Sequence, residues 1–272
     1  MTTKIATQIA EAPQKGLQWK FEFIGALSKP GASRVFTAAA FHAFAQTIKP
    51  GVSEGTTRAL SELLISAGML QRVSNGIFLN KRKFPPAELV EAAAYLRHGA
   101  VISLHSVLGE MGFLNNPSRA VVAVLPTSAS KRPKLGEHRT SAGDTFMYYG
   151  LAEKFFPQPG EDDFELLQPG RPCATFRPEA ALLQWLHLAR MQRSTLALPP
   201  VDVDMSLLNE DLLERLSRKW GLEPALHAWL EKAKAANFGE EPDLFAPSAP
   251  QEDKGKAAAE AKQRLLARRR MV

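Results

Sequence analysis

Residues 52–79 read VSEGTTRALSELLISAGMLQRVSNGIFL, and this stretch decides the fold of the N-terminal part of the chain. It predicts a helix, a glycine stop and two short strands joined by a tight turn. Ser53 can cap the helix through its hydroxyl, and Gly68 can end it in a left-handed conformation. Asn75-Gly76 is a strong hairpin signal, because both residues tolerate positive φ. This order is typical of the second half of a winged helix-turn-helix.

The predicted helix has two unlike faces. Its apolar residues fall at helical spacing and predict one buried stripe, made of Leu60, Leu63, Leu64 and Ala67. The opposite face carries Arg58, Ser61 and Glu62, with Gly55 leaving room near the N-terminus. The acidic Glu62 can accept a hydrogen bond from cytosine or pair with Arg58 four residues earlier.

The residues before this stretch supply the first half of the same fold. Residues 17–27 predict a helix with an aromatic face, and the Lys29-Pro30-Gly31 turn ends it. Residues 34–36 predict a short strand, and Thr37 can cap a helix over residues 38–46. The resulting order of helix, strand, helix, turn, helix and hairpin is the winged-helix order.

The positive charge of the chain is concentrated in the same region. The formal net charge of the 272 residues is +6. Residues 1–90 hold eleven Lys and Arg against five Glu, so they account for the whole excess. A positive excess beside a helix of this kind favours contact with the phosphates of nucleic acid.

The rest of the chain predicts an α+β region followed by a helical end. Strands over residues 119–126 and 144–150, with helices over 87–97, 102–111 and 179–191, indicate a small sheet with helices packed on it. Two further helices follow the Leu198-Pro199-Pro200 linker. The predicted division is a flexible arm (1–16), a winged helix-turn-helix domain (17–84), a mixed α/β domain with a helical end (87–238) and a basic flexible tail (239–272).

Two basic segments are open to more than one interpretation. Residues 127–143 predict a polar loop that contacts DNA, an acidic protein surface or RNA, or that is simply solvated. The last residues, KGKAAAEAKQRLLARRRMV, predict either a disordered solubilising tail or a segment that contacts nucleic acid.

No constellation of residues in the sequence predicts catalysis. The six histidines are scattered, and Asp202-Val203-Asp204 follows two prolines without the upstream Gly-Ser turn that nucleotidyl transfer requires. Glu161-Asp162-Asp163 is interpreted as a solvated turn. The single cysteine, Cys173, has no activating neighbour in the sequence and predicts a cytoplasmic protein without disulfides. We therefore expect no enzyme activity, no metal, no cofactor and no membrane segment.

Three motifs in order along the chain resemble the AbiEi family, the antitoxin and transcriptional-regulator half of type IV abortive-infection toxin–antitoxin systems. Residues 67–78 (AGMLQRVSNGIF) resemble its wing, residues 98–113 (HGAVISLHSVLGEMGF) the start of its antitoxin domain, and residues 176–183 (FRPEAALL) a helix start. Ala180 departs from the usual lysine of the last motif, and Gln184 from a common aspartate. The resemblance implies a winged helix that binds the system's own promoter and a C-terminal domain that counteracts a nucleotidyltransferase-like toxin, with or without direct contact.

We therefore expect a DNA-binding transcriptional autorepressor and antitoxin that acts in phage defence. Arg58 and Ser61 are predicted to read base edges, and Thr57 to lie at the groove edge or on a phosphate. The predicted phosphate contacts of the wing are Arg72, Asn75, Lys81, Arg82 and Lys83. The alternative is a winged helix that binds another protein and has no sequence-specific contact with DNA.

Overall fold

The structure is a computed structural model, and it describes residues 17–116, 118–128, 133–158, 166–201 and 204–238. Helices and two β-sheets are present, so the predicted α+β class is confirmed. The chain divides into two compact units, residues 1–233 and 234–272. The predicted arm (1–16), the predicted tail (239–272), Asp202 and the Glu161-Asp162-Asp163 turn lie outside the described residues.

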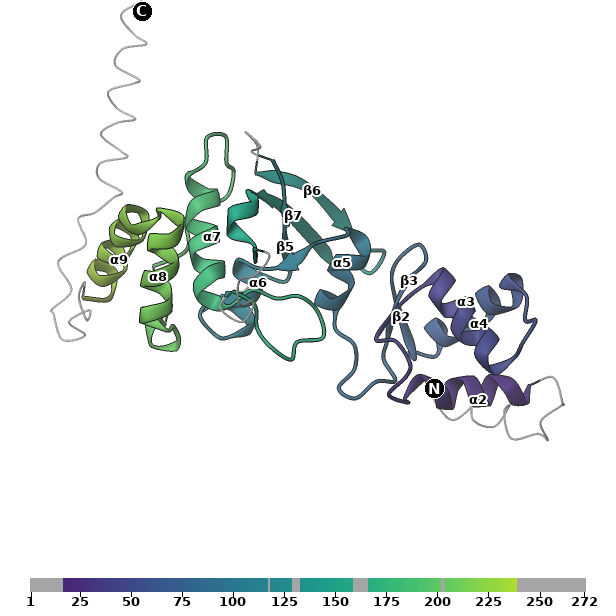
Figure 1. Ribbon diagram of the computed structural model, residues 1–272. Coiled ribbons are helices and arrows are strands. Elements are labelled where there is room, and N and C mark those ends of the chain that lie inside the picture. The colour runs from purple at the N-terminus through teal and green to yellow at the C-terminus, as the bar shows by residue number, and fades with distance from the viewer. Residues whose placement is uncertain (1–16, 117, 129–132, 159–165, 202–203, 239–272) are drawn as a thin grey trace, which may run out of the picture. The chain divides into compact units, whose positions relative to one another are not determined.

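Among the described residues, the N-terminal elements comprise three helices and a three-stranded sheet. In chain order they are α2 (Gln18–Leu27), β1 (Val35–Thr37), α3 (Ala38–Ile48), α4 (Glu54–Ser66), β2 (Leu70–Ser74) and β3 (Ile77–Asn80). The sheet has the order β1-β3-β2, and both pairings are antiparallel. The hairpin β2–β3 follows α4 directly, and its second strand occupies the centre of the sheet (Figure 1).

Local chemistry explains where these helices begin and end. The Thr37 hydroxyl accepts a hydrogen bond from the Ala40 amide at 3.1 Å, and Ser53 caps α4 in the same way at 3.2 Å from the Thr56 amide. Gly68 takes a φ of +70° after α4, a conformation that costs a residue with a side chain more than it costs glycine. These three predictions from sequence are confirmed.

Aromatic side chains fill the core of this N-terminal group. Phe23 and Phe36 are almost completely buried, and each packs against Phe41 with ring centroids 5.1 and 5.7 Å apart. Phe78 from β3 closes the cluster at 6.0 Å from Phe41. Because these rings come from α2, β1, α3 and β3, their burial holds helices and sheet together.

The buried face of α4 differs from the predicted one. Leu60 and Leu64 are buried as expected, but Leu63 is 54% exposed and Ala67 is exposed as well. The buried stripe is completed instead by Thr57 and Ser61. The helix can turn this face inward because both hydroxyls satisfy themselves on backbone carbonyls of the same helix. The prediction from hydrophobicity alone therefore identified only part of the buried face, Leu60 and Leu64.

The remaining described elements form a second α+β group. They are the 3₁₀ helix η1 (Leu89–Ala92), α5 (Ala93–Leu96), β4 (Val101–Ile102), α6 (His105–Glu110), β5 (Val121–Pro126), β6 (Lys134–Arg139), β7 (Thr145–Leu151), the 3₁₀ helix η2 (Glu153–Phe155), α7 (Pro178–Arg190), the 3₁₀ helix η4 (Met205–Leu207), α8 (Glu210–Trp220) and α9 (Glu223–Phe238). The sheet order is β4-β5-β7-β6, with β5 and β7 parallel and the other pairs antiparallel.

Three predicted elements of this region were wrong in detail. Residues 134–139, placed in a loop, form the edge strand β6, whose polar sequence suits a strand with one neighbour. The predicted helix over 87–97 is divided between η1 and α5, and the predicted helix over 102–111 begins only at His105. Leu104 has a φ of +54° and interrupts the helical pattern before that residue.

Helix α7 forms the centre of the largest hydrophobic cluster. Pro178 occupies its first turn, as predicted, and almost every residue from there to Leu188 is buried. Two buried polar side chains on it accept hydrogen bonds: Oε1 of Glu179 accepts from the Asn209 amide at 2.8 Å, and Gln184 accepts from the Ser103 hydroxyl at 2.5 Å. Among the described residues, no helix has the length and apolar character needed to cross a membrane.

Candidate nucleic-acid interface

A polar hollow of about 650 Å³ lies between the start of α3, one side of α4 and the β2–β3 turn. Five of the eight predicted site residues line it: Thr57, Arg58, Ser61, Arg72 and Asn75. Lys81, Arg82 and Lys83 are not part of this lining. The structure therefore brings the helix and hairpin residues together and separates them from the basic residues after β3.

The hairpin turn is fixed against α3. The Ala38 amide donates a hydrogen bond to the Gly76 carbonyl at 2.7 Å, and Gly76 has a φ of +77°. Ser74 pairs with Ile77 across the two-residue turn, and a β-bulge lies between Arg72 and Ser74. Of the two turn residues only Gly76 takes positive φ, so the turn differs from one in which both residues are left-handed. Asn75 is left exposed at the tip.

Thr57 and Ser61 do not present their hydroxyls to solvent. Thr57 is 3% exposed and donates to the Glu54 carbonyl at 2.9 Å, while Ser61 is 4% exposed and donates to the Arg58 carbonyl at 2.8 Å. The Thr57 oxygen is also 3.1 Å from Nδ1 of His42. The burial of both hydroxyls does not fit their predicted contacts with base edges or phosphates. Thr57 instead connects α4 to His42 of α3, and Ser61 is hydrogen-bonded within α4.

Arg58 is the exposed cation of α4. It forms no ion pair with any described residue, although Glu54 and Glu62 lie one helical turn before and after it. Gly55 and Ala59 are exposed beside it and add little bulk. The guanidinium of Arg58 is thus available to a ligand that approaches the outer face of α4.

Glu62 binds a different arginine from the one considered from sequence. Its carboxylate accepts a hydrogen bond from the guanidinium of Arg72 on β2, and the two side chains are 56% and 34% exposed. The charged residues lining the hollow are Glu54, Arg58, Glu62 and Arg72, so their formal charges cancel. The hollow is therefore polar but not basic.

The basic residues after β3 contact backbone carbonyls. The Lys81 ammonium donates to the Ala87 carbonyl at 2.6 Å, and the Lys83 ammonium donates to the carbonyls of Lys29 and Pro30 at 2.6 and 3.2 Å. Arg82 is exposed. Lys81 and Lys83 thus fasten the chain at the base of the sheet and do not extend from the tip of the hairpin.

The interface also has a feature that the sequence prediction missed. The spacing of the apolar residues predicted that Leu63 is buried, but its side chain is exposed on the outer side of α4. One sequence feature could have revealed this exposure. The hydroxyl residues Thr57 and Ser61 share the helical period of Leu60 and Leu64, and such residues can occupy buried helix positions by bonding to their own backbone.

Several of the groups considered for catalysis can be placed among the described residues. Among the described residues, no cluster of three or more His, Cys, Asp or Glu side chains has the geometry of a metal site. Burial raises the pKa of the Cys173 thiol, which lies 3.7 Å from the hydroxyl of Thr175. Asp204, the described member of the Asp202-Val203-Asp204 segment, caps η4 by accepting from the Ser206 amide at 3.0 Å.

Comparison with known proteins gives few matches. No family model matches the chain, and no curated protein matches it. The chain is similar to the crystal structure of the RV2827C protein from Mycobacterium tuberculosis, at 15% sequence identity and a TM-score of 0.46. That likeness covers 79% of this chain and 77% of the mycobacterial chain.

Proposed function

We propose that residues 17–84 form a winged helix-turn-helix that binds double-stranded DNA with α4 in the major groove. The observation that carries the proposal is the outer face of α4, where an exposed arginine without an ion-pair partner among the described residues lies beside a hairpin fixed to the preceding helix. Helix–turn–helix proteins place the second helix of the motif in the major groove.

The outer face of α4 has suitable chemistry for base edges. The helix is 13 residues long, about 20 Å, and the major groove is about 12 Å wide. Gly55 and Ala59 allow its backbone to approach closely. Arg58 can donate two hydrogen bonds to a guanine, and the exposed Leu63 can contact a thymine methyl group. Leu63 replaces Ser61 in this assignment.

Phosphate contacts are assigned to the residues around α4. Described residues 17–90 carry nine Lys and Arg against four Glu. Asn75 at the turn and Arg82 after β3 are exposed. Arg72, whose ion pair with Glu62 is exposed and therefore worth at most about 1 kcal/mol, can exchange that carboxylate for a phosphate. These contacts would orient the helix without reading sequence.

The test is binding of the whole chain to DNA from upstream of its own gene, measured by fluorescence anisotropy at several salt concentrations. We expect the logarithm of the binding constant to fall linearly with the logarithm of salt concentration, with a slope that counts the phosphates contacted. A scrambled duplex of the same length is the control and should bind more weakly. Equal binding of the two duplexes would overturn sequence-specific recognition.

We extend the proposal to autorepression and antitoxin activity, and this part rests on the resemblance to the AbiEi family. The expected partner is a nucleotidyltransferase-like toxin with Gly-Ser and Asp-x-Asp motifs, encoded next to this chain. Co-expression tests it: growth arrested by the neighbouring gene should be restored by this chain, and should not be restored by residues 1–84 alone. Growth arrest that persists with the full chain would contradict the antitoxin role.

A second candidate is a winged helix that binds a protein. The observation in its favour is the cancellation of charge in the hollow beside α4, together with the exposed Leu63. If this candidate is correct, the chain should bind DNA weakly and with the same affinity for every sequence. The anisotropy experiment above therefore separates the two candidates.

A further inference from the structure

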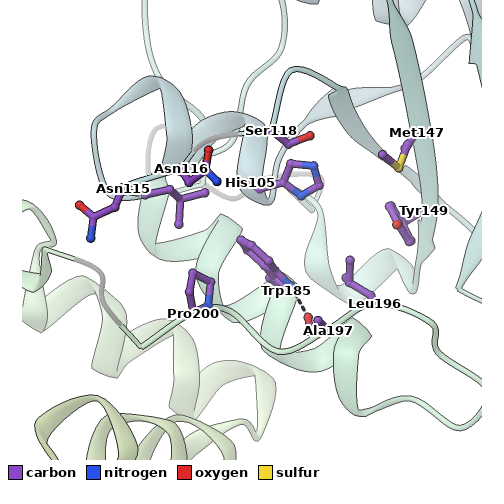
Figure 2. Close-up of a pocket in the computed structure, with 11 residues that line it drawn as sticks. His105, Asn115, Asn116, Ser118, Met147, Tyr149, Trp185, Leu196, Ala197 and Pro200 are labelled. Atoms are coloured by element: carbon purple, nitrogen blue, oxygen red, sulfur yellow. Dashed lines mark hydrogen bonds between the residues drawn. The ribbon is translucent and has the colours of Figure 1, made fainter. Parts of the chain in front are cut away.

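His105 and His42 each line a cavity, and their ring nitrogens are bonded differently. His105 lines a cavity of about 390 Å³ in the second α+β group, together with Tyr149 and Trp185 (Figure 2), and its Nε2 is buried without a hydrogen-bond partner among the described residues. His42 on α3 is half-buried and lines the hollow beside α4. Both of its ring nitrogens lie within hydrogen-bond distance of a neighbouring side chain. His42 therefore belongs to a hydrogen-bond network at the candidate interface.

The network runs from α3 into the first turn of α4. Nε2 of His42 is 3.0 Å from the side-chain amide nitrogen of Gln46 on the same helix, and Nδ1 of His42 is 3.1 Å from the hydroxyl oxygen of Thr57. The Thr57 hydroxyl donates to the carbonyl of Glu54, the first residue of α4, at 2.9 Å. Because Arg58 follows Thr57 directly, the network ends beside the residue that is proposed to read bases.

The directions of these hydrogen bonds select one neutral form of the imidazole. A hydroxyl has a single hydrogen, and that of Thr57 is used on the Glu54 carbonyl, so toward His42 the oxygen can only accept. Nδ1 of His42 must then carry the proton, and Nε2 accepts a hydrogen bond from the Gln46 amide. All of these contacts are satisfied together in the Nδ1–H tautomer and not in the Nε2–H tautomer.

The network adds a directional contact to an apolar interface between two helices. Phe41 and Ala45 of α3 belong to the same buried hydrophobic cluster as Leu60 and Leu64 of α4. Burial of apolar surface is non-directional, whereas a hydrogen bond weakens steeply as its angle departs from linear. The contact between His42 and Thr57 therefore fixes the rotation of α4 on α3 more closely than apolar packing does by itself.

We propose that His42 is a positioning residue that sets the rotation of α4 on α3, and with it the approach of Arg58 to a base edge. This role rests on the proposed binding of DNA by α4. A recognition side chain must be held within about 0.5 Å and 10–20° of its productive geometry, and hydrogen bonds of neighbouring residues provide such support. The hydrogen bond from Nδ1 to Thr57 thus contributes to sequence preference and not to contacts with phosphates.

The first test compares His42→Leu, which removes the donor, with His42→Asn, whose side-chain amide nitrogen can donate from nearly the same place as Nδ1. For the whole chain, the ratio of affinities for upstream DNA and a scrambled duplex should fall about three- to tenfold in His42→Leu, the effect of one neutral hydrogen bond. His42→Asn should restore most of that ratio, and neither change should alter the affinity for the scrambled duplex by more than about twofold. Ile24→Val, which trims a partly buried side chain of α2, is the control for lost stability and should keep the ratio.

The second test measures the tautomer in the unchanged protein, so it does not depend on the folding of a variant. In ¹⁵N NMR spectra at about pH 8.5, where a histidine side chain is neutral, Nδ1 of His42 should be protonated and Nε2 should not. The exposed His227 of α9 is the internal reference and should show the mixture of tautomers of a free side chain.

The two tests separate failure of this inference from failure of the proposed function. Full discrimination between the duplexes by a folded His42→Leu chain would overturn the role of His42 and leave DNA recognition intact, as would a protonated Nε2 in the neutral ring. The role would also be overturned if His42→Asn restored none of the ratio, or if Ile24→Val lowered it as much as His42→Leu. Equal binding of both duplexes by the unchanged chain would overturn the proposed function, and the role of His42 with it.

Discussion

The carboxylate of Glu62 on α4 accepts a hydrogen bond from the guanidinium of Arg72 on β2, so the helix and the hairpin are joined across the hollow between them. This pair also neutralises one of the two arginines that line the hollow. Both side chains are partly exposed, so the pair contributes little to stability and can be exchanged for a phosphate contact.

Replacing Glu62 with Gln should increase DNA affinity. The change removes a negative charge from the α4 face and frees Arg72 for a phosphate, so we expect several-fold tighter binding at low salt and a salt slope steeper by about 1. Fluorescence anisotropy across a salt series measures both quantities. Glu22→Gln, an exposed glutamate of α2, is the control. Equal gains in the two variants would mean that net charge alone, without the freed Arg72, explains the effect.

Replacing Arg58 with Ala should reduce sequence preference more than overall affinity. Loss of an arginine–guanine contact costs about 1–3 kcal/mol on the cognate site and leaves the phosphate contacts intact. The ratio of affinities for upstream DNA and a scrambled duplex measures it. Arg82→Ala is the matched control, because a phosphate contact should weaken both duplexes alike. An unchanged ratio in Arg58→Ala would remove Arg58 from base recognition.

The ion pair between Arg34 and Glu91 should be a major contributor to stability. Nε and Nη2 of Arg34 donate to the two carboxylate oxygens at 2.7 and 2.8 Å, and Glu91 is 3% exposed. The Glu91 carboxylate raises the pKa of the Arg34 guanidinium. Arg34→Ala strands a buried carboxylate and should lower the free energy of unfolding by about 3 kcal/mol.

Urea denaturation of the Arg34→Ala chain measures this loss, and a double variant provides the control. Because Arg34→Ala with Glu91→Leu removes the stranded charge as well, we expect it to recover part of the stability. If the single and the double variant were equally unstable, the buried charge would not be the cause.

Stability should fall in acid because of His105. Burial lowers its pKa from 6.5 in the unfolded chain to about 4. Between these values the unfolded state binds more protons than the folded state, so stability is lost as the pH falls through this window. The loss on going from pH 7 to pH 4.5 is about 2–3 kcal/mol from this residue.

The measurement compares urea midpoints at pH 7 and pH 4.5 for the original chain and for His105→Phe. The variant has no imidazole at this position and should lose less stability than the original chain over the same interval. An equal loss in both would assign the acid sensitivity to other groups.

The elements with strong local signals were the ones that could be predicted. Ser53 and Gly68 mark the ends of α4 by chemistry that operates within a single turn, and the Asn75-Gly76 turn marks the hairpin. The β-branched residues of β5 and the proline at the start of α7 are similarly local. Strand β6 has a polar sequence and becomes a strand only because β7 offers it a hydrogen-bonding edge.

The candidate interface was predictable only in part. Arg58, Arg72 and Asn75 lie around one hollow as expected, whereas the burial of Thr57 and the exposure of Leu63 reverse what polarity indicates. That reversal depends on hydrogen bonds to the helix backbone, which the shared period of Thr57 and Ser61 with Leu60 and Leu64 permits, and on the proximity of His42, which leaves no pattern in the sequence.

The sequence by itself determined the class of fold, the caps and turns of the N-terminal group and the location of its excess charge, because these depend on neighbouring residues and on composition. Only the tertiary structure decided which face of α4 is buried, which arginine pairs with Glu62, and that His105 closes a cavity with Trp185 and Tyr149. These features depend on how different elements of the chain pack on one another, and their energies depend on burial and distance, which local sequence does not specify.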